Sequence, residues 1–309
     1  MYNKRIKIII MKKTLILTLI LSFACINVFS QEEAEQKKGE WKKGGMMSLN
    51  ASQVSFTNWA AGGQNSIAAN SFVNLFANFK KNRMTWDNTL DLGYGKLFQG
   101  IKEHKTVYKT DDKIDFSSKY GRYAFEHWYY AALIGFKTQF DQGFKNPTDT
   151  VKISDFFSPA YLNLSIGMDY KPCDNFSLLI SPLTGKVTFV IDEYLSSIGA
   201  FGVDPGKTFR PEFGGYIKAQ YKVNFFKNMT YSTKIDLFSN YLEKPQNIDV
   251  NWENLVMMKI NNWFSASIHY TMIYDDDVNV KWIDADNIEH FSPKLQIKQM
   301  IGVGLTYKF

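Results

Sequence analysis

The chain ends in IGVGLTYKF, residues 301–309, and this stretch decides the fold. Apolar residues alternate with small or polar ones, and the alternation reaches back to residue 297. A period of two residues indicates a β-strand whose two faces meet different surroundings. At about a dozen residues, this strand is long for the sheet of a soluble protein. One face carries Ile297, Ile301, Val303, Leu305, Tyr307 and Phe309, and the other carries Lys298, Gly302, Gly304, Thr306 and Lys308.

The same alternation recurs along the chain, each time over about the ten residues that a tilted strand needs to cross a bilayer. The pattern predicts an all-β fold, a transmembrane antiparallel β-barrel of about twelve strands. Pro182 and Gly185 interrupt one segment, so the count has a range of about ten to fourteen. The segments before the last are 46–56, 67–80, 84–97, 112–122, 128–140, 161–170, 176–190, 216–226, 229–241, 249–260 and 263–274.

The connections between these segments alternate between short and long. Outer-membrane barrels have tight periplasmic turns and extended external loops, so the alternation is typical of that class. It also predicts that both termini lie on the periplasmic side. Short connections fall at 81–83, 123–127, 171–175, 226–228 and 261–262, and long ones at 57–66, 98–111, 141–159, 192–211, 242–248 and 275–295.

A closed barrel gives the physical reason for the terminal alternation. In a bilayer every backbone N–H and C=O must be paired within the protein, so the last strand must hydrogen-bond to the first. Outward side chains must be apolar, whereas inward ones can be polar. Aromatic residues make up 16% of the chain and many lie near the ends of the segments, as the girdles at the two interfaces require.

Residues 1–30 have the features of a cleaved secretory signal peptide, with Lys12 and Lys13 before an apolar run and Ser30 before the cleavage point. We expect residues 31–45 to form a flexible periplasmic leader and residues 46–309 to form the outer-membrane barrel. Cys25 lies within the signal, where lipidation is the alternative to simple cleavage.

Charge and cysteine content exclude two other classes of protein. The full chain has 36 basic and 30 acidic residues, but five of the basic ones lie in the signal. The mature chain would therefore be close to neutral, which argues against a nucleic-acid partner. Cys173 is the single cysteine after the signal, so no intramolecular disulfide can staple a small secreted scaffold.

The ending GLTYKF resembles the signal by which the barrel-assembly machinery recognises its substrates. Gly304, Tyr307 and Phe309 match that pattern, whereas Gly302 stands where the pattern prefers a polar residue. The resemblance implies export with the help of periplasmic chaperones and assembly by that machinery.

The amino-terminal part resembles a family of Gram-negative outer-membrane proteins, the domain of unknown function 3078 (DUF3078). The matching residues run from Trp41 to Gly95 and include NWAAGGQNS at 58–66 and Trp86. The resemblance implies an outer-membrane barrel, in contact with the lipid bilayer and lipopolysaccharide, and no known activity. Gly62 and Gly63 predict a tight bend rather than a phosphate-binding loop, because no lysine or helix follows.

Charged residues of both signs recur on the predicted inward face. One interpretation is a hydrated pore, and the other is a barrel filled by cross-strand ion pairs that does not conduct. The sequence alone leaves both open. The lumen-lining candidates are Asp87, Asp91, Lys113, Asp115, Lys119, Lys137, Asp169, Lys218, Lys222, Lys234, Asp236, Glu253, Lys259, His269, Lys298 and Lys308.

Histidines are the candidates for catalysis by an outer-membrane hydrolase. His269 lies between Ser267 and Thr271, but side chains two residues apart on a strand lie about 7 Å apart, too far for a hydrogen bond. We therefore predict no catalytic residue. The other three are His104, His127 and His290.

Asp275, Asp277 and Asn279 have the spacing that opens a calcium-binding loop. Val280 stands where such a loop needs glycine, and no glutamate closes it, so the EF-hand interpretation fails. These three residues stay weak candidates for a looser calcium or lipopolysaccharide-bridging site. No cofactor is predicted.

The sequence predicts a non-enzymatic outer-membrane barrel, acting as a narrow channel or as a structural or binding component of the membrane. An outer-membrane enzyme acting on lipid or polypeptide is the alternative. A soluble periplasmic β-sandwich fits less well, because the strands are long and the chain ends on Phe309.

Overall fold

The computed structural model of the chain describes residues 39–56, 64–100, 106–146, 148–284 and 287–309. The predicted signal peptide at 1–30, with Cys25, lies outside the described residues. So do the first eight residues of the predicted leader, the glycine pair at 62–63 and His104.

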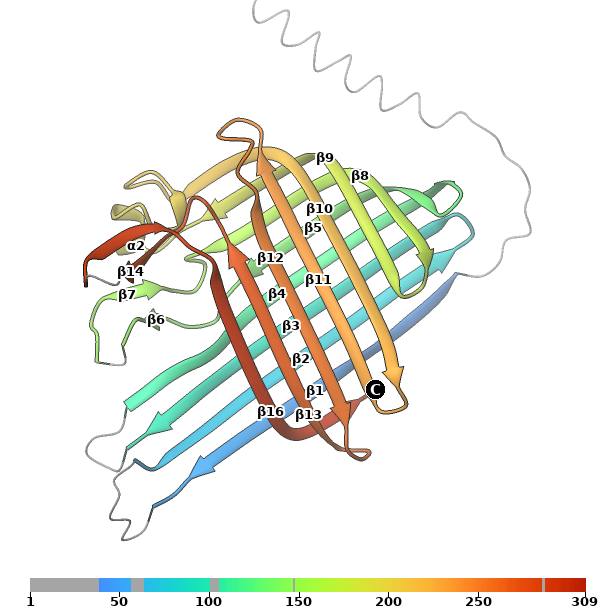
Figure 1. Cartoon of the computed structure of the whole chain (residues 1–309). Helices are drawn as coiled ribbons and strands as arrows, with labels where there is room; N and C mark the ends of the chain where they lie inside the picture. Colours follow the sequence, from blue (N-terminus) through green and yellow to red (C-terminus); the bar gives the residue numbers. More distant parts are fainter. Residues whose placement is uncertain (1–38, 57–63, 101–105, 147, 285–286) are drawn as a thin grey trace, which may run out of the picture. The chain divides into compact units, whose positions relative to one another are not determined.

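Twelve strands form one closed antiparallel barrel (Figure 1). The predicted fold class and strand number are confirmed. The strands are β1 (Glu40–Val54), β2 (Ser66–Lys81), β3 (Met84–Gln99), β4 (Thr106–Phe125), β5 (Trp128–Thr138), β8 (Ala160–Cys173), β9 (Phe176–Phe189), β10 (Phe209–Phe226), β11 (Met229–Asn240), β12 (Asp249–Lys259), β13 (Phe264–Tyr274) and β16 (Gln296–Lys308). Each pairs with its neighbours in this order, and β16 closes onto β1.

Short turns and long loops lie at opposite ends of the barrel, as the sequence predicts. The turn end holds the β2–β3, β4–β5, β8–β9, β10–β11 and β12–β13 connections, and the loop end holds the longer ones. Three long loops contain secondary structure of their own: β6 (Gly143–Phe144) with β7 (Lys152–Ser154), α2 (Glu193–Ser197) with the 3₁₀ turn η3 (Ala200–Gly202), and β14 (Asn279–Ile283) with β15 (Glu289–Pro293). Among the described residues, no helix has the length and hydropathy needed to cross a bilayer.

Some strand boundaries differ from the predicted ones. β1 begins at Glu40, so residues 40–45 belong to the barrel wall and not to the leader. Backbone pairing with β2 continues through this part of β1 even though its side chains do not alternate clearly. β4 and β10 are likewise longer than predicted, because their neighbours hold the backbone beyond the alternating residues.

The segment interrupted by Pro182 is a barrel strand, β9. Its pairing with β8 and β10 shifts register around the proline, so that a β-bulge absorbs the missing N–H. Gly167 on β8 allows the close approach there, because a Cβ at this position would lie 2.1 Å from the carbonyl oxygen of Ile180. The bulge therefore explains how the weakest predicted segment still closes the barrel.

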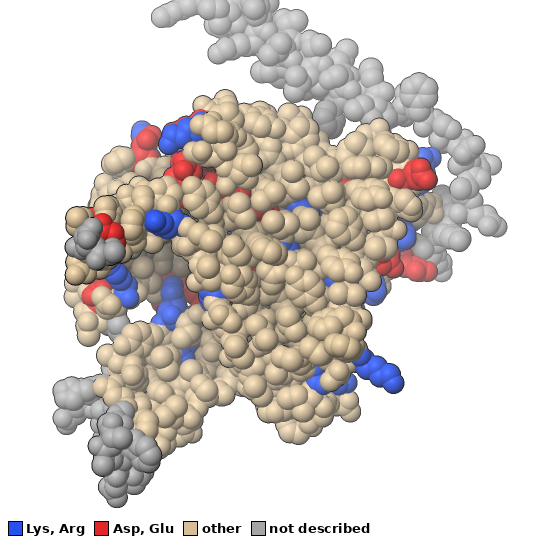
Figure 2. Space-filling view, viewed as in Figure 1, with Lys and Arg blue, Asp and Glu red and all other residues tan. Residues whose placement is uncertain are grey.

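The two faces of the wall differ as a membrane barrel requires. Large apolar side chains are exposed on the outer face, including Leu164 and Ile166 on β8 and Leu305 on β16. Figure 2 shows most of the wall in view free of charged atoms, with lysine, arginine and acidic side chains gathered toward the two ends. The inner face buries polar groups instead, such as Ser165, Thr184 and many charged residues. The inner face is therefore largely polar, and it also holds a small apolar cluster that contains Leu133 and Leu179.

Candidate functional site

A layer of eight charged side chains crosses the middle of the barrel. It contains four lysines, three aspartates and one glutamate, so its formal charges balance. We call it the central charge layer. Its members come from β3, β4, β5, β10, β11 and β12 and are Asp91, Lys113, Asp115, Lys137, Lys218, Lys234, Asp236 and Glu253.

Two ion pairs of this layer join opposite walls. Lys113 Nζ lies 2.6 Å from Glu253 Oε2, which links β4 to β12. Lys234 Nζ lies 4.0 Å from Asp91 Oδ2, which links β11 to β3. In both cases the two strands are six places apart in a ring of twelve. The side chains of these pairs therefore span the lumen at this height.

Asp115 is the most buried acid of the layer, with 3% of its surface exposed. Its Oδ2 lies 2.6 Å from Lys234 Nζ, 3.6 Å from Lys113 Nζ and 3.9 Å from Lys137 Nζ. Three lysines from three strands thus surround one carboxylate. Because a buried carboxylate without cations would be strongly unfavourable, Asp115 and its lysines hold one another in place.

Asp236 is the second buried acid. It accepts hydrogen bonds from Lys137 (2.8 Å), Lys218 (3.1 Å) and the Tyr216 hydroxyl (2.7 Å). Lys218 and Asp236 are 4% and 7% exposed. The layer is therefore a connected network of direct contacts.

A second charged group lies nearer the turn end, on β3, β4 and β8. Lys119 Nζ lies 2.7 Å from Asp169, Lys171 Nζ lies 3.4 Å from the same carboxylate, and Lys171 also contacts Asp87. Two lysines again balance two aspartates. The sequence missed Lys171 because that residue was assigned to a turn, although it shares the parity of Asp169.

The remaining predicted lumen residues lie toward the two ends of the barrel. Lys222, Lys259 and Lys308 are exposed near the turn end and form no ion pair with any described residue. Lys298 contacts Asp111 of β4 on the loop side of the central charge layer. His269 packs its ring edge-on against Phe72, with 5.4 Å between ring centroids.

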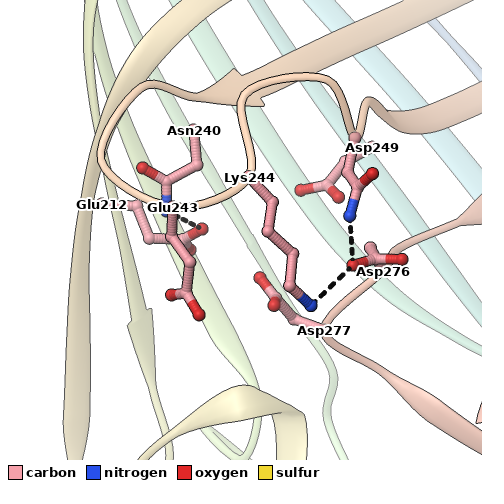
Figure 3. A pocket seen from close by; sticks show the side chains of 8 residues that line it. Glu212, Asn240, Glu243, Lys244, Asp249, Asp276 and Asp277 are labelled. Carbon is pink, nitrogen blue, oxygen red and sulfur yellow. Dashed lines mark hydrogen bonds and ion pairs between the residues drawn. The ribbon is translucent and has the colours of Figure 1, made fainter.

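A cluster with an excess of acids lies at the loop end (Figure 3). Lys186 lies 2.8 Å from Asp249 and 3.4 Å from Glu212, and Arg210 lies 2.8 Å from Asp277. A cavity in this cluster has a volume of only about 10 Å³, enough for about one water molecule. The cavity is lined by Glu212, Asn240, Glu243, Lys244, Asn247, Asp249, Asp276 and Asp277.

The weak metal candidates fall beside this cluster. Asp277 is held by Arg210, and its backbone N–H donates to the Asp275 carboxylate at 2.9 Å. Burial raises the pKa of Asp275, and the charges of Asp249 and Asp277 act in the same direction. Asn279 begins β14. No group of three or more histidine, cysteine or acidic side chains is arranged to hold a metal within the described ranges.

The other described histidines lie in connections at the two ends of the barrel. His127 occupies the β4–β5 turn with a positive φ of 66°. His290 lies 2.7 Å from Asp284 and stacks on Trp282 at 4.5 Å in the β14–β15 hairpin. The buried hydroxyl of Ser267 has no hydrogen-bond partner within the described part of the chain, so it does not form a pair with His269.

The residues of the predicted assembly signal lie at the closure of the barrel. Gly304 pairs with Asn50, and a Cβ on Gly304 would lie 2.1 Å from the carbonyl oxygen of Leu49. Phe309 exchanges two backbone hydrogen bonds with Gly45, and its ring stacks with that of Tyr307. These residues therefore have a direct role in joining the last strand to the first.

Part of the chain matches a known family model. Residues 51–144 match the family model described as "Protein of unknown function (DUF3078)". The match runs from β1 to β6 and confirms the predicted resemblance to this family, and it covers residues 51–95 of the predicted stretch from Trp41 to Gly95. No curated protein matches the chain.

Two solved structures resemble the chain at low sequence identity. The crystal structure of an outer membrane channel from Pseudomonas putida F1 is 8% identical, with a TM-score of 0.36 over 92% of this chain and 100% of that chain. OmpT, an outer membrane protein of Vibrio cholerae, is 9% identical, with a TM-score of 0.30 over 89% of this chain and 100% of that chain.

Proposed function

We propose that the protein is a non-enzymatic outer-membrane barrel whose lumen is closed by the central charge layer, and that it acts as a structural or binding component rather than as an open pore. The carrying observation is the direct contact of opposite walls by Lys113 with Glu253 and by Lys234 with Asp91. Of the two interpretations that the sequence leaves open, the proposal favours the barrel filled by cross-strand ion pairs over the hydrated pore.

Ion conduction would need a continuous path of water through the central charge layer. Asp115, Lys218 and Asp236 are each less than one-tenth exposed, which leaves little room for such a path. The four positive and four negative charges also give the layer no net charge that would select anions or cations. Opening the lumen would require several buried ion pairs to separate together, which is unfavourable.

The outer-membrane location is supported by the barrel itself. Its outer face is apolar across the middle and its charged groups lie at the ends or inside (Figure 2). Apart from the loop-end part of the seam between β1 and β16, pairing around the ring satisfies backbone hydrogen bonds within the protein, as a bilayer demands. A signal peptide at residues 1–30 would supply the route of export.

The enzymatic alternative has little support from the described histidines. A hydrolase of the serine type needs a nucleophile and a base within hydrogen-bond reach. The Ser267 hydroxyl has no hydrogen-bond partner among the described residues, and the Ser292 hydroxyl accepts a hydrogen bond from the Trp282 indole. We therefore favour a function without bond-breaking chemistry.

Single-channel recording in a planar bilayer tests the closed lumen. The unaltered protein should show no sustained conducting level. The charge-neutral variant Lys113→Ala, Asp115→Ala, Lys234→Ala, Glu253→Ala should conduct, because it removes the side chains that span the lumen. The matched control Lys244→Ala, Asp276→Ala removes a loop ion pair and should stay silent. Steady conductance of the unaltered protein, unchanged in the four-residue variant, would reject the proposal.

A further inference from the structure

The closure of the barrel between β1 and β16 is incomplete. Backbone pairing runs from Gly45 with Phe309 to Asn50 with Gly304 and then stops. β1 continues to Val54 while paired with β2 alone, and β16 begins at Gln296 while paired with β13 alone. In Figure 1 the two strands meet near the C-terminus and diverge toward the loop end.

The hydrogen-bond register shows which groups are left at this edge. Gly45 and Phe309 exchange backbone hydrogen bonds at 2.9 and 3.1 Å. In an antiparallel pair such residues alternate, so every second residue of β16 directs its N–H and C=O toward β1. Beyond the paired part these residues are Ile297, Gln299, Ile301 and Val303. The edge therefore presents a row of donors and acceptors that no strand of the described residues pairs with.

This edge lies at a depth where lipid would surround it. Tyr307 and Trp263 are exposed aromatic residues at the turn end, where an interfacial girdle is expected. A membrane strand needs about ten residues to cross, and counting from Tyr307 reaches Ile297. Ile301 is 68% exposed on the outward face. The unpaired edge thus falls in the part of the barrel nearer the loops, within the predicted bilayer span.

Hydrocarbon cannot satisfy backbone N–H and C=O groups, so this edge favours an occupant that can. The groups repeat about every 6.6 Å, the spacing of alternate residues in a strand. An acyl chain has no such groups, and a lipid head group does not carry them at that spacing. An extended polypeptide does.

We propose that the β16 edge from Ile297 to Ile301 is a docking site for an extended strand of a partner polypeptide. The strand adds antiparallel to β16 and so runs in the same direction as β1. Recognition is through the backbone groups, with the side chains of the added strand lying outward beside Ile297 and Ile301 and inward beside Lys298 and Gly302. This is recognition by β-strand addition. It does not depend on whether the lumen is closed.

A peptide with the sequence of residues 48–56, SLNASQVSF, is a suitable probe because β1 itself pairs with β16 in this direction. A fluorescent form should bind the refolded protein in lipid vesicles. N-methylation at the positions of Ala51, Gln53 and Ser55 removes the donors that face β16 and should weaken binding by at least about tenfold. The matched control, methylated at the positions of Asn50, Ser52 and Val54, should bind within about threefold of the unmodified peptide.

A disulfide test reports whether the seam closes on itself instead. In a Cys173→Ser background, Met46→Cys with Lys308→Cys joins two paired residues and should oxidise readily. Val54→Cys with Met300→Cys occupies the same register beyond the pairing and should remain reduced. Heat-dependent migration on a detergent gel confirms that each variant is folded.

Two results would overturn the proposal. Rapid oxidation of the Val54→Cys, Met300→Cys variant would show that β1 and β16 pair along this part of the seam without a partner. Equal binding of both methylated peptides, with displacement by dodecanoic acid, would show that the gap takes an amphiphile rather than a strand.

Discussion

Removing the charge of Asp115 should strongly destabilise the barrel. Asp115→Asn keeps the shape of the side chain but leaves Lys113, Lys137 and Lys234 facing a neutral group. At the 2.6 Å separation of Asp115 from Lys234, and an effective dielectric constant of about 20, the attraction is about 6 kcal/mol. Desolvation offsets part of this, so we expect a net loss of about 3–5 kcal/mol in the free energy of unfolding.

The double variant separates a charge network from ordinary packing. Lys234→Met alone should also cost about 3–5 kcal/mol, because it leaves the buried Asp115 with weaker partners. Asp115→Asn with Lys234→Met restores the balance of charge. It should therefore cost at least about 2 kcal/mol less than the sum of the single changes.

Urea unfolding of the protein in lipid vesicles, followed by tryptophan fluorescence, measures these values. The control pair is Lys244 with Asp276 at the loop end, where Lys244 is largely exposed. Lys244→Met and Asp276→Asn should each change stability by less than about 1 kcal/mol. Additive losses at Asp115 and Lys234, or losses no larger than those of the control, would refute the idea that ion pairs hold the lumen closed.

Three further predictions concern the wall. Ile268→Lys, near the bilayer midplane, should lower the free energy of unfolding by about 2–4 kcal/mol, whereas Thr271→Lys on the inward face should be tolerated. Equal losses for the two variants, measured by unfolding in vesicles, would contradict the assignment of the two faces. Gly167→Ala should lower the free energy of unfolding by about 1–3 kcal/mol, because the new Cβ would meet the backbone of β9. The control Gly185→Ala, whose Cβ would have no atom within 4 Å, should change it by less than about 0.5 kcal/mol in the same assay. Deleting Phe309 should lower the heat-modifiable, assembled fraction in outer membranes, and an unchanged fraction would remove its role in closure.

The sequence by itself determined the class of fold. Alternation in IGVGLTYKF and in the other segments assigned one apolar and one polar face to each strand, because successive side chains of a strand point to opposite sides. The lengths of the connections assigned the turns to one end and the loops to the other. These signals are local, so they can be recognised in the sequence without knowing which strands are neighbours in the barrel.

The same alternation placed the charged candidates on the inward face, but it did not show which of them form ion pairs with each other. Lys171 was missed where a turn was expected to begin, and β1 was started too late because residues 40–45 do not alternate. Backbone pairing with a neighbour extends such strands, and no side-chain pattern records it.

Only the tertiary structure decided how the interior is filled and how the barrel closes. Lys113 and Glu253 are 140 residues apart in sequence, and their contact depends on the width of the barrel and on which strands face each other. The unpaired part of the seam, between Val54 at the end of β1 and Gln296 at the start of β16, depends on how many residues of the two strands stay hydrogen-bonded to each other. Backbone hydrogen bonds make that choice, and because every residue except proline offers the same N–H and C=O, the order of side chains does not specify it.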